Sequence, residues 1–407
     1  MNCRNCGTTL SLELIDLGFS PPSNAYLSPE DLNKVEAWVP LKVLVCQDCW
    51  LVQTLDFHDE ADVFTENYAY FSSTSTSWVE HARIFVENSI TDLGLGANSF
   101  VIEVASNDGY LLQHFKKKGI PHLGIEPTRS TAEAAISKGI ETIVEFLSPE
   151  VAARVISTHK KADLIIGNNV FAHVPDIRGF TDSLAIMLSD RGSVVLEFPH
   201  LLKLLQENSF DTIYHEHFSY LSLHSCLDVL LRSELQIWKV EELTTHGGSL
   251  RIYASHISNG RQVDVSVSKL LEIEKDFGIT SVSAYTNLAV AANLLRDEVL
   301  EFLITCRTKG LKVAAYGAAA KGNTLLNFSG VKSNLIQMVC DSAPSKQGNY
   351  LPGSHIPIVG MDALKQYSPD AVIVLPWNLS TEILGVLRSN LGNKPRVVRF
   401  SPKFQEL

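Results

Sequence analysis

Four polar side chains stand together at Tyr214–His217, in the order Tyr-His-Glu-His. Imidazole titrates near neutral pH, so a histidine here can act as a general base. Tyrosine or histidine donors can stabilise charge that develops on a carbonyl oxygen. Such a group could therefore turn a ketone into an enolate. The run is equally compatible with a solvated turn or a transition-metal site, since imidazole and carboxylate both ligate metals.

Two further polar groups precede this run. His173 follows Asn168 and Asn169, and an isolated histidine in such a place is more often satisfied in a loop or a core than used in chemistry. A polar-aromatic cluster, Tyr-Ala-Tyr-Phe-Ser-Ser, occupies residues 68–73. Neither group specifies a reaction by itself.

The segment Phe100–Gly109 has the pattern of a strand that runs into a polar turn and then a helix. Ligands of open α/β sheets bind at the carboxyl ends of strands, and small residues there let backbone approach them closely. The turn lacks the full Gly-x-Gly-x-x-Gly of a dinucleotide site. This fits S-adenosylmethionine (SAM), which has no pyrophosphate, better than NAD. The alternative is a polar turn of an ordinary α/β domain. The predicted cofactor-binding residues are Glu103, Ala105, Asn107, Gly109, Glu126, Asn168 and Asn169.

Four cysteines form two Cys-x-x-Cys pairs, Cys3 with Cys6 and Cys46 with Cys49. Two such pairs in a segment too small for its own core predict a structural zinc site with four thiolates. A closed site of this kind leaves no open position for catalysis. The alternatives are incidental pairs or a redox dithiol. The other three cysteines, Cys226, Cys306 and Cys340, have apolar surroundings and are expected to be buried packing residues.

The pattern of apolar residues predicts the strands and helices that carry these groups. Short apolar runs from about residue 75 to 255 predict strands of a parallel, doubly covered sheet with helices between them. Residues 262–300 are expected to form one long amphipathic helix, or two, and a smaller α/β unit follows. A weak helical pattern occupies residues 28–36. We divide the chain into an N-terminal module (1–62), a central domain (63–258) and a C-terminal domain (259–407).

Composition limits the class of protein. Hydrophobic residues make up 45% of the 407, which is ample for more than one core. The net charge of −11 argues against a nucleic-acid polymer as partner. The sequence shows neither a secretory signal nor an apolar run long enough to span a bilayer, and no protein partner is evident. We therefore expect a cytoplasmic protein, where thiols stay reduced.

These motifs, in this order, resemble the nucleotide-sugar C-methyltransferases, such as the enzymes that methylate C3 of dTDP-linked 4-keto-deoxyhexoses. The resemblance rests on the paired cysteines, Glu103–Gly109, Tyr214–His217 and a turn at Tyr316–Asn323, and it spans nearly the whole chain. It implies an α/β fold. A central Rossmann-like SAM methyltransferase domain is flanked by a small N-terminal zinc-binding module and a C-terminal Rossmann-like domain that helps to bind the nucleotide-sugar.

The resemblance also implies roles for individual residues. His217 is expected to be the base, with Tyr214 and Glu216 orienting or polarising the keto-sugar and Tyr68 and His173 near the sugar. The turn after Tyr316 could present backbone N–H groups to a pyrophosphate at a helix N-terminus, with Lys321 adding a charge. Tight helix–strand packing is the alternative for that turn. The expected substrate-binding residues are Tyr70, Ser72, Gly317, Ala319, Lys321, Gly322, Asn323 and Asp341.

The resulting hypothesis is a SAM-dependent C-methyltransferase that adds a methyl group to C3 of a nucleotide-linked 4-keto-6-deoxyhexose. The expected nucleotide is thymidine diphosphate (dTDP). Three other classes stay open at this point. They are an O- or N-methyltransferase of a small metabolite, a zinc-knuckle scaffold without activity, and an NAD-dependent sugar-nucleotide oxidoreductase using Gly317–Gly322.

Overall fold

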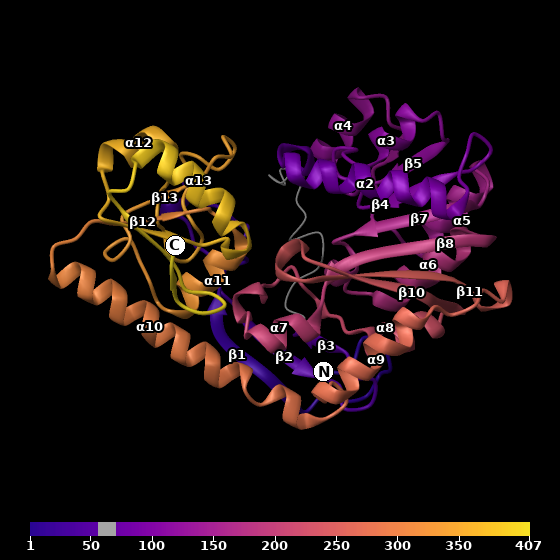
Figure 1. Cartoon of the computed structure of the whole chain (residues 1–407), viewed down its shortest axis with the longest axis horizontal. Coiled ribbons are helices and arrows are strands. Elements are labelled where there is room, and N and C mark those ends of the chain that lie inside the picture. Colours follow the sequence, from indigo (N-terminus) through magenta and orange to yellow (C-terminus); the bar gives the residue numbers. More distant parts are fainter. Residues whose placement is uncertain (56–70) are drawn as a thin grey trace.

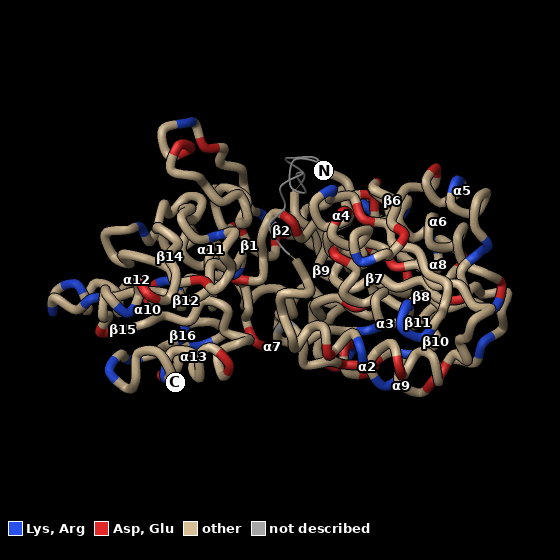
Figure 2. The backbone as a smooth tube through the Cα atoms, turned by 90° about the horizontal axis from the view of Figure 1, so that it is seen from above, with Lys and Arg blue, Asp and Glu red and all other residues tan. Residues whose placement is uncertain are grey.

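The computed structural model describes residues 1–55 and 71–407, apart from the side chain of His246. Two α/β lobes stand side by side, and the N-terminal module lies at their base (Figure 1). Basic and acidic residues are interspersed along both lobes (Figure 2). In the described part of the chain no helix is long and apolar enough to cross a membrane.

The N-terminal module is a small antiparallel sheet in the order β1-β2-β3-β9. Its last strand comes from the central domain, so the two parts are joined through backbone hydrogen bonds. The weak helical pattern at residues 28–36 yields only the short 3₁₀ helix η1. The elements are β1 (Leu12–Ser20), η1 (Asp31–Asn33), β2 (Val39–Val45), β3 (Val52–Thr54) and β9 (Ser219–Tyr220).

The central domain is built on a seven-stranded sheet in the order β10-β11-β8-β7-β4-β5-β6. Its strands are β4 (Val101–Val104), β5 (His122–Ile125), β6 (Thr142–Ile143), β7 (Ala162–Asn168), β8 (Leu188–Pro199), β10 (Leu235–Leu243) and β11 (Ser249–His256). The prediction of a wholly parallel sheet is wrong at one edge, where β11 runs antiparallel to β8 and to β10. The connection between β10 and β11 is too short for a crossover helix, so these strands must form a hairpin.

Helices cover both faces of this sheet. The covering helices are α2 (Thr76–Leu93), α3 (Leu112–Lys117), α4 (Arg129–Ser137), α5 (Pro149–Thr158), α6 (Ile177–Met187) and α8 (Leu223–Leu231). The leucines of α7 (Leu201–Glu207) pack instead in the core that the N-terminal module shares with the C-terminal lobe. Short 3₁₀ helices are η2 (Ser72–Thr74), η3 (Phe171–His173), η4 (Phe210–Thr212), η5 (Thr245–Gly247) and η6 (Ile257–Asn259). Side chains alternate between the faces, as strand geometry requires: Val101 packs in the core under α2 and α3, while Ile102 packs in the core under α5, α6 and α8.

The helical stretch predicted over residues 262–300, as one helix or two, is two helices: α9 (Val265–Phe277) and α10 (Leu288–Thr308), with η7 (Val282–Tyr285) between them. Gly278 ends α9 in the left-handed conformation that favours glycine. The C-terminal sheet has the order β14-β13-β12-β15-β16-β17. Its elements are β12 (Val313–Tyr316), α11 (Ala320–Phe328), β13 (Val339–Cys340), β14 (Ile358–Val359), α12 (Met361–Tyr367), β15 (Ala371–Val374), η8 (Trp377–Leu379), α13 (Ser380–Leu391), β16 (Arg396–Arg399) and β17 (Gln405–Glu406).

The N-terminal module shares its apolar interior with both lobes. Leu14 and Leu17 of β1 pack in one core with α10 and the C-terminal sheet, whereas Leu51 packs in a core of the central domain. The three unpaired cysteines Cys226, Cys306 and Cys340 are buried in apolar cores, which confirms that part of the prediction. The two proposed domain boundaries stay predictions, and the first falls outside the described residues.

Candidate active site

A cavity of about 410 Å³ lies where the central and C-terminal parts meet, which is a typical size for a small-molecule site. Strand ends and loops of both parts contribute to its wall. Most of the predicted site residues that the structure describes line it. They are Ser72, Ala105, Asn107, Glu126, Asn168, Asn169, His173, Tyr214, Glu216, His217, Ala319 and Lys321.

The turn after β4 forms one side of the cavity, and this is the turn that the sequence predicts to bind the cofactor. Ala105 and Asn107 both have positive φ angles, 55° and 51°, a conformation that few non-glycine residues adopt. Glu126, at the end of β5, accepts hydrogen bonds from the backbone N–H groups of Asn107 and Thr128, each at 2.9 Å. The carboxylate therefore fixes the shape of the turn while it faces the cavity. Burial raises the pKa of Glu126 above its ordinary value, against the effect of these backbone donors.

Two predicted cofactor-binding residues lie beneath this turn instead of in the cavity wall. Glu103 is 1% exposed, and burial beside Glu126 and Asp108 raises its pKa well above the ordinary value. Gly109 has a φ of 75°, and a side chain there would collide with Ile140. These two residues shape the turn from below.

The loop after β6 also lines the cavity, which the sequence analysis missed. Glu145, Phe146 and Leu147 provide a carboxylate and two apolar side chains to the cavity wall. The part of the wall formed by Asn107 and Glu126 is called the Asn107–Glu126 side below. On β7, Asn168 donates to the Tyr110 hydroxyl at 3.3 Å, so both side chains are ordered at the same strand edge. In the sequence, Glu145 is distinguished only by its position just after a very short strand.

Tyr214 and His217 face each other across a tight turn. The His217 backbone N–H donates to the Tyr214 carbonyl at 3.0 Å, which brings the two side chains to the same side. The Tyr214 hydroxyl lies 2.7 Å from Nε2 of His217, and Nδ1 of His217 lies 3.2 Å from the Thr212 carbonyl. A carbonyl only accepts, so Nδ1 carries the ring proton and Nε2 holds the lone pair.

Both flanking parts hold this turn in place. The hydroxyl of Thr324, on α11, donates to the Ile213 carbonyl at 2.8 Å. On the other side, the Phe218 carbonyl accepts from the Thr54 backbone at 3.1 Å and from the Arg4 guanidinium at 2.6 Å. The Tyr214–His217 turn is therefore fixed by residues of the N-terminal module and of the C-terminal lobe.

His173 and Glu216 complete this side of the cavity. The His173 ring meets the His217 ring edge to face, with centroids 4.6 Å apart. Burial lowers the pKa of His173 to about 4, so it is neutral at physiological pH. Burial raises the pKa of Glu216 to about 7, although hydrogen bonds from Asn24 act in the opposite direction. This carboxyl group therefore titrates in the range where a base or hydrogen-bond acceptor is useful.

The wall from the C-terminal lobe carries two lysines. Lys321 lies in the first turn of α11, where its ammonium group donates to Asn378 at 3.1 Å and lies 4.6 Å from the centre of the Trp377 ring. Burial lowers the pKa of Lys321 to about 8, although Asp211 acts in the opposite direction. The Lys346 ammonium donates to the Ala318 carbonyl at 2.8 Å. Both cations border the N-terminus of α11, where the helix dipole also favours an anion.

Four of the expected substrate-binding residues support this wall from behind. Side chains at Gly317 and Gly322 would collide with Pro376 and Leu375, so these glycines serve tight packing. Asn323 donates to the Ser23 carbonyl at 3.1 Å. Both Asp341 oxygens accept backbone N–H groups, from Ala318 and Ala343. With its oxygens engaged in this way, Asp341 is poorly placed to hold the ribose of NAD.

Tyr68 and Tyr70 lie outside the described residues. The predicted Ser72 does line the cavity, and its backbone N–H donates to the Asn107 side chain at 2.8 Å. The segment before α2 is thus attached to the cofactor turn.

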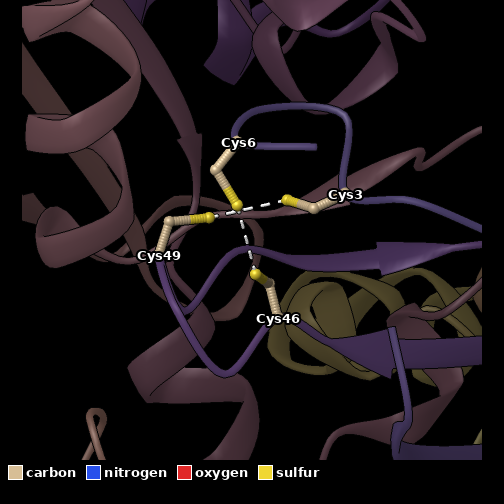
Figure 3. A group of neighbouring side chains, drawn as sticks. All are labelled: Cys3, Cys6, Cys46 and Cys49. Atoms are coloured by element: carbon tan, nitrogen blue, oxygen red, sulfur yellow. Dashed lines mark hydrogen bonds between the residues drawn. The ribbon is translucent and has the colours of Figure 1, made fainter. Parts of the chain in front are cut away.

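The four predicted zinc ligands come together in the N-terminal module. All four sulfur atoms lie within 4.8 Å of one another, with Cys3 3.5 Å from Cys49 and Cys6 3.4 Å from Cys46 (Figure 3). Four thiolates around a zinc ion would stand about 3.8 Å apart, so the group fits a tetrahedral zinc site. The side-chain amide of Gln53 donates to Cys3 Sγ at 3.3 Å and completes the surroundings of that sulfur.

Comparison with known proteins finds three family models that match successive parts of the chain. A zinc binding domain model matches residues 3–64, a methyltransferase domain model matches 79–240, and a C-methyltransferase C-terminal domain model matches 244–400. Two solved methyltransferase structures are similar in part. One, from Clostridium acetobutylicum, covers 44% of this chain and 92% of its own, with 10% identity and a TM-score of 0.35. The other, magnesium protoporphyrin IX methyltransferase of Synechocystis, covers 44% and 83%, with 15% identity and a TM-score of 0.35.

The fold and the site define a SAM-dependent methyltransferase with a zinc-binding module at its N-terminal end. The C-methyltransferase NovU of Streptomyces niveus is 34% identical over 396 residues, which cover 97% of this chain and 94% of that protein. The chain belongs to this C-methyltransferase family and is a SAM-dependent C-methyltransferase. The family therefore favours carbon over oxygen or nitrogen as the methyl acceptor.

Proposed function

We propose that the enzyme methylates C3 of a nucleotide-linked 4-keto-6-deoxyhexose, with thymidine diphosphate as the expected nucleotide. The observation that carries the proposal is the Tyr214–His217 pair, which lines the same cavity as the Asn107–Glu126 side and the two lysines at α11. A substrate with a ketone at one end and a diphosphate at the other matches that distribution of groups.

His217 is the base in this proposal. Its Nε2 lone pair accepts the proton from C3, which is acidic because it lies next to the C4 ketone. General-base catalysis of this kind contributes roughly 10²- to 10⁴-fold in rate. Without substrate the Tyr214 hydroxyl donates to Nε2, so this hydroxyl must turn to the ketone oxygen before Nε2 takes the proton. There it donates to the oxygen of the developing enolate.

SAM, when bound, supplies an electrophilic methyl group on a sulfonium ion. The Asn107–Glu126 side would hold it, because a buried carboxylate there can receive ribose hydroxyls. The electrons of the enolate form the new C3–CH₃ bond as the sulfur–methyl bond breaks. The products are a C3-branched sugar nucleotide and S-adenosylhomocysteine, and His217 must then release its proton.

Lys321 and Lys346 would hold the diphosphate. Both are cations that border the first turn of α11, whose backbone N–H groups and dipole favour negative charge. With the charge of the diphosphate neutralised by these lysines, the sugar would lie toward His217. The N-terminal cysteines would hold zinc as a structural ion, since four thiolates leave no open position.

The experiment is product analysis. Incubating the enzyme with SAM and a panel of dTDP-, GDP- and CDP-linked 4-keto-sugars should give a product heavier by one methyl group with the dTDP-linked substrates. NMR of the product should place the methyl on C3. A methyl on C5, the other carbon next to the ketone, would correct the position, and a methyl on oxygen or nitrogen would overturn the mechanism.

A further inference from the structure

A loop of the N-terminal module reaches the substrate cavity. It follows β1 and comprises residues 21–27, and Asn24 of this loop lines the cavity together with Glu216 and Lys346. The cysteine pattern predicts only a structural zinc site for the N-terminal module. The loop therefore adds a role for that module that the cysteines do not explain.

Hydrogen bonds attach the loop to the C-terminal lobe at three places. The Ser23 carbonyl accepts from Asn323 at 3.1 Å, and the Tyr26 hydroxyl donates to the Ala318 carbonyl at 2.6 Å. Leu27 and Tyr350 exchange backbone hydrogen bonds of 3.0 and 2.8 Å. Because both sides of Asn24 are anchored, its position in the cavity wall is fixed.

Asn24 bridges this loop to the central domain. Its Nδ2 donates to Oε2 of Glu216 at 2.6 Å, while its Oδ1 lies 3.4 Å from the Tyr26 hydroxyl. A carboxylate oxygen accepts and an amide nitrogen donates, so the amide nitrogen of Asn24 is the end that faces Glu216. Glu216 is 2% exposed, and a short hydrogen bond to a buried carboxylate is one of the stronger kinds.

Burial and Asn24 act on Glu216 in opposite directions. Burial raises the pKa of Glu216 to about 7, and the side-chain and backbone hydrogen bonds from Asn24 lower it. Other titratable groups surround the same space. On the neighbouring elements they are Tyr26, Glu126, Glu145, His173, Tyr214, His217, Lys321 and Lys346.

We infer that Asn24 is a positioning residue of the reaction: its amide holds the Glu216 side chain in the cavity as a carboxylate, which accepts a hydrogen bond from a hydroxyl or amino group of the sugar. This inference rests on the proposed function for the identity of the ligand. It makes the N-terminal module part of the substrate site, because the group that favours the ionised form of Glu216 comes from that module.

The first test is the pH profile of kcat/KM for Asn24→Leu and Asn24→Asp. Leucine removes the donor, and the nearly isosteric aspartate places a second carboxylate against Glu216. Both changes disfavour the ionised form of Glu216, so the acid limb should move up by about one pH unit or more. Activity should return toward the wild-type level at higher pH in the leucine variant. The inference is overturned if both variants keep the wild-type acid limb or lose the same fraction of activity at every pH.

Asn33→Leu is the matched control, since Asn33 is an exposed residue of the same module and lies outside the cavity wall. Its pH profile should equal that of the wild type. Zinc content and SAM binding by calorimetry should be unchanged in all variants, which separates positioning from misfolding.

A second test needs no substrate. Difference infrared spectroscopy against Glu216→Gln isolates the carboxyl band of Glu216, whose titration midpoint should rise in both Asn24 variants. If the wild type methylates none of the keto-sugars but the midpoint moves, the proposed function fails while the Asn24–Glu216 coupling stands. If methylation occurs and the midpoint does not move, the inference about Asn24 is wrong.

Discussion

The Tyr214 hydroxyl lies 2.7 Å from Nε2 of His217, while Nδ1 of the same ring lies 3.2 Å from the Thr212 carbonyl. The backbone carbonyl fixes the tautomer, so the lone pair of the ring is directed toward Tyr214. This pair lines the cavity that also receives Asn107 and Glu126. These two hydrogen bonds therefore orient the His217 ring before a substrate binds.

Tyr214→Phe should lower kcat about tenfold or more, because it removes a hydrogen bond to the base and a donor for the enolate oxygen. The affinity for SAM, measured by calorimetry, should not change. Tyr367→Phe is the control, since the Tyr367 hydroxyl bonds to Gln337 on the exposed side of the C-terminal lobe. An unchanged kcat in Tyr214→Phe would remove Tyr214 from the mechanism.

Glu126→Gln should weaken SAM binding about tenfold. The carboxylate accepts two backbone N–H groups, and an amide can present only one oxygen to them, so the cofactor turn loses a hydrogen bond. Calorimetric titration with SAM measures the effect. Glu133→Gln, an exposed position on α4, should bind SAM as the wild type does. Equal affinities for the two variants would contradict the assignment of the cofactor side.

Lys321→Met should raise KM for the sugar nucleotide about tenfold and leave SAM affinity unchanged. Burial lowers the pKa of Lys321 to about 8, so the side chain is charged below that pH and neutral above it. In the wild type, substrate affinity should therefore fall as the pH rises through about 8, and the variant should lose this dependence. The exposed Lys309→Met serves as control. A KM in Lys321→Met equal to that of the wild type would place the diphosphate elsewhere.

Cys46→Ser should reduce the zinc content below one ion per chain and lower the melting temperature, because metal binding in such modules contributes directly to folding. Elemental analysis and thermal denaturation measure the two effects. Cys306→Ser, at a buried cysteine of a different apolar core, should keep the zinc. A wild-type protein that contains no zinc when purified without chelator would contradict the structural-zinc assignment.

Most residues of the predicted cofactor site could be identified from the sequence, because parallel strands end at one edge of a sheet. Asn107, Glu126 and Asn168 each follow a strand pattern, so their meeting in one cavity wall was predictable. The four cysteines were predictable for a similar reason, since their spacing suits one metal ion. Tyr214 and His217 stand three residues apart, and a single turn is enough to bring them together.

Other parts of the site depend on how distant segments pack. Asn24 reaches Glu216 across 192 positions of sequence, through a loop that contacts with Ala318, Asn323 and Tyr350 hold in place. No periodic pattern marks such a residue. The hairpin of β10 and β11 was mistaken for parallel strands because buried strands of either direction have the same apolar pattern.

In the proposed reaction, His217 removes the proton from the carbon that is methylated. The direct measurement compares His217→Asn with the wild type for two rates, methyl transfer and exchange of the C3 proton with deuterated solvent in the presence of S-adenosylhomocysteine. Both rates should fall by roughly 10²-fold or more in the variant, while SAM affinity and the activity of His159→Asn, outside the cavity wall, stay at wild-type levels. Exchange and methyl transfer that both persist at wild-type rates in His217→Asn would contradict the account.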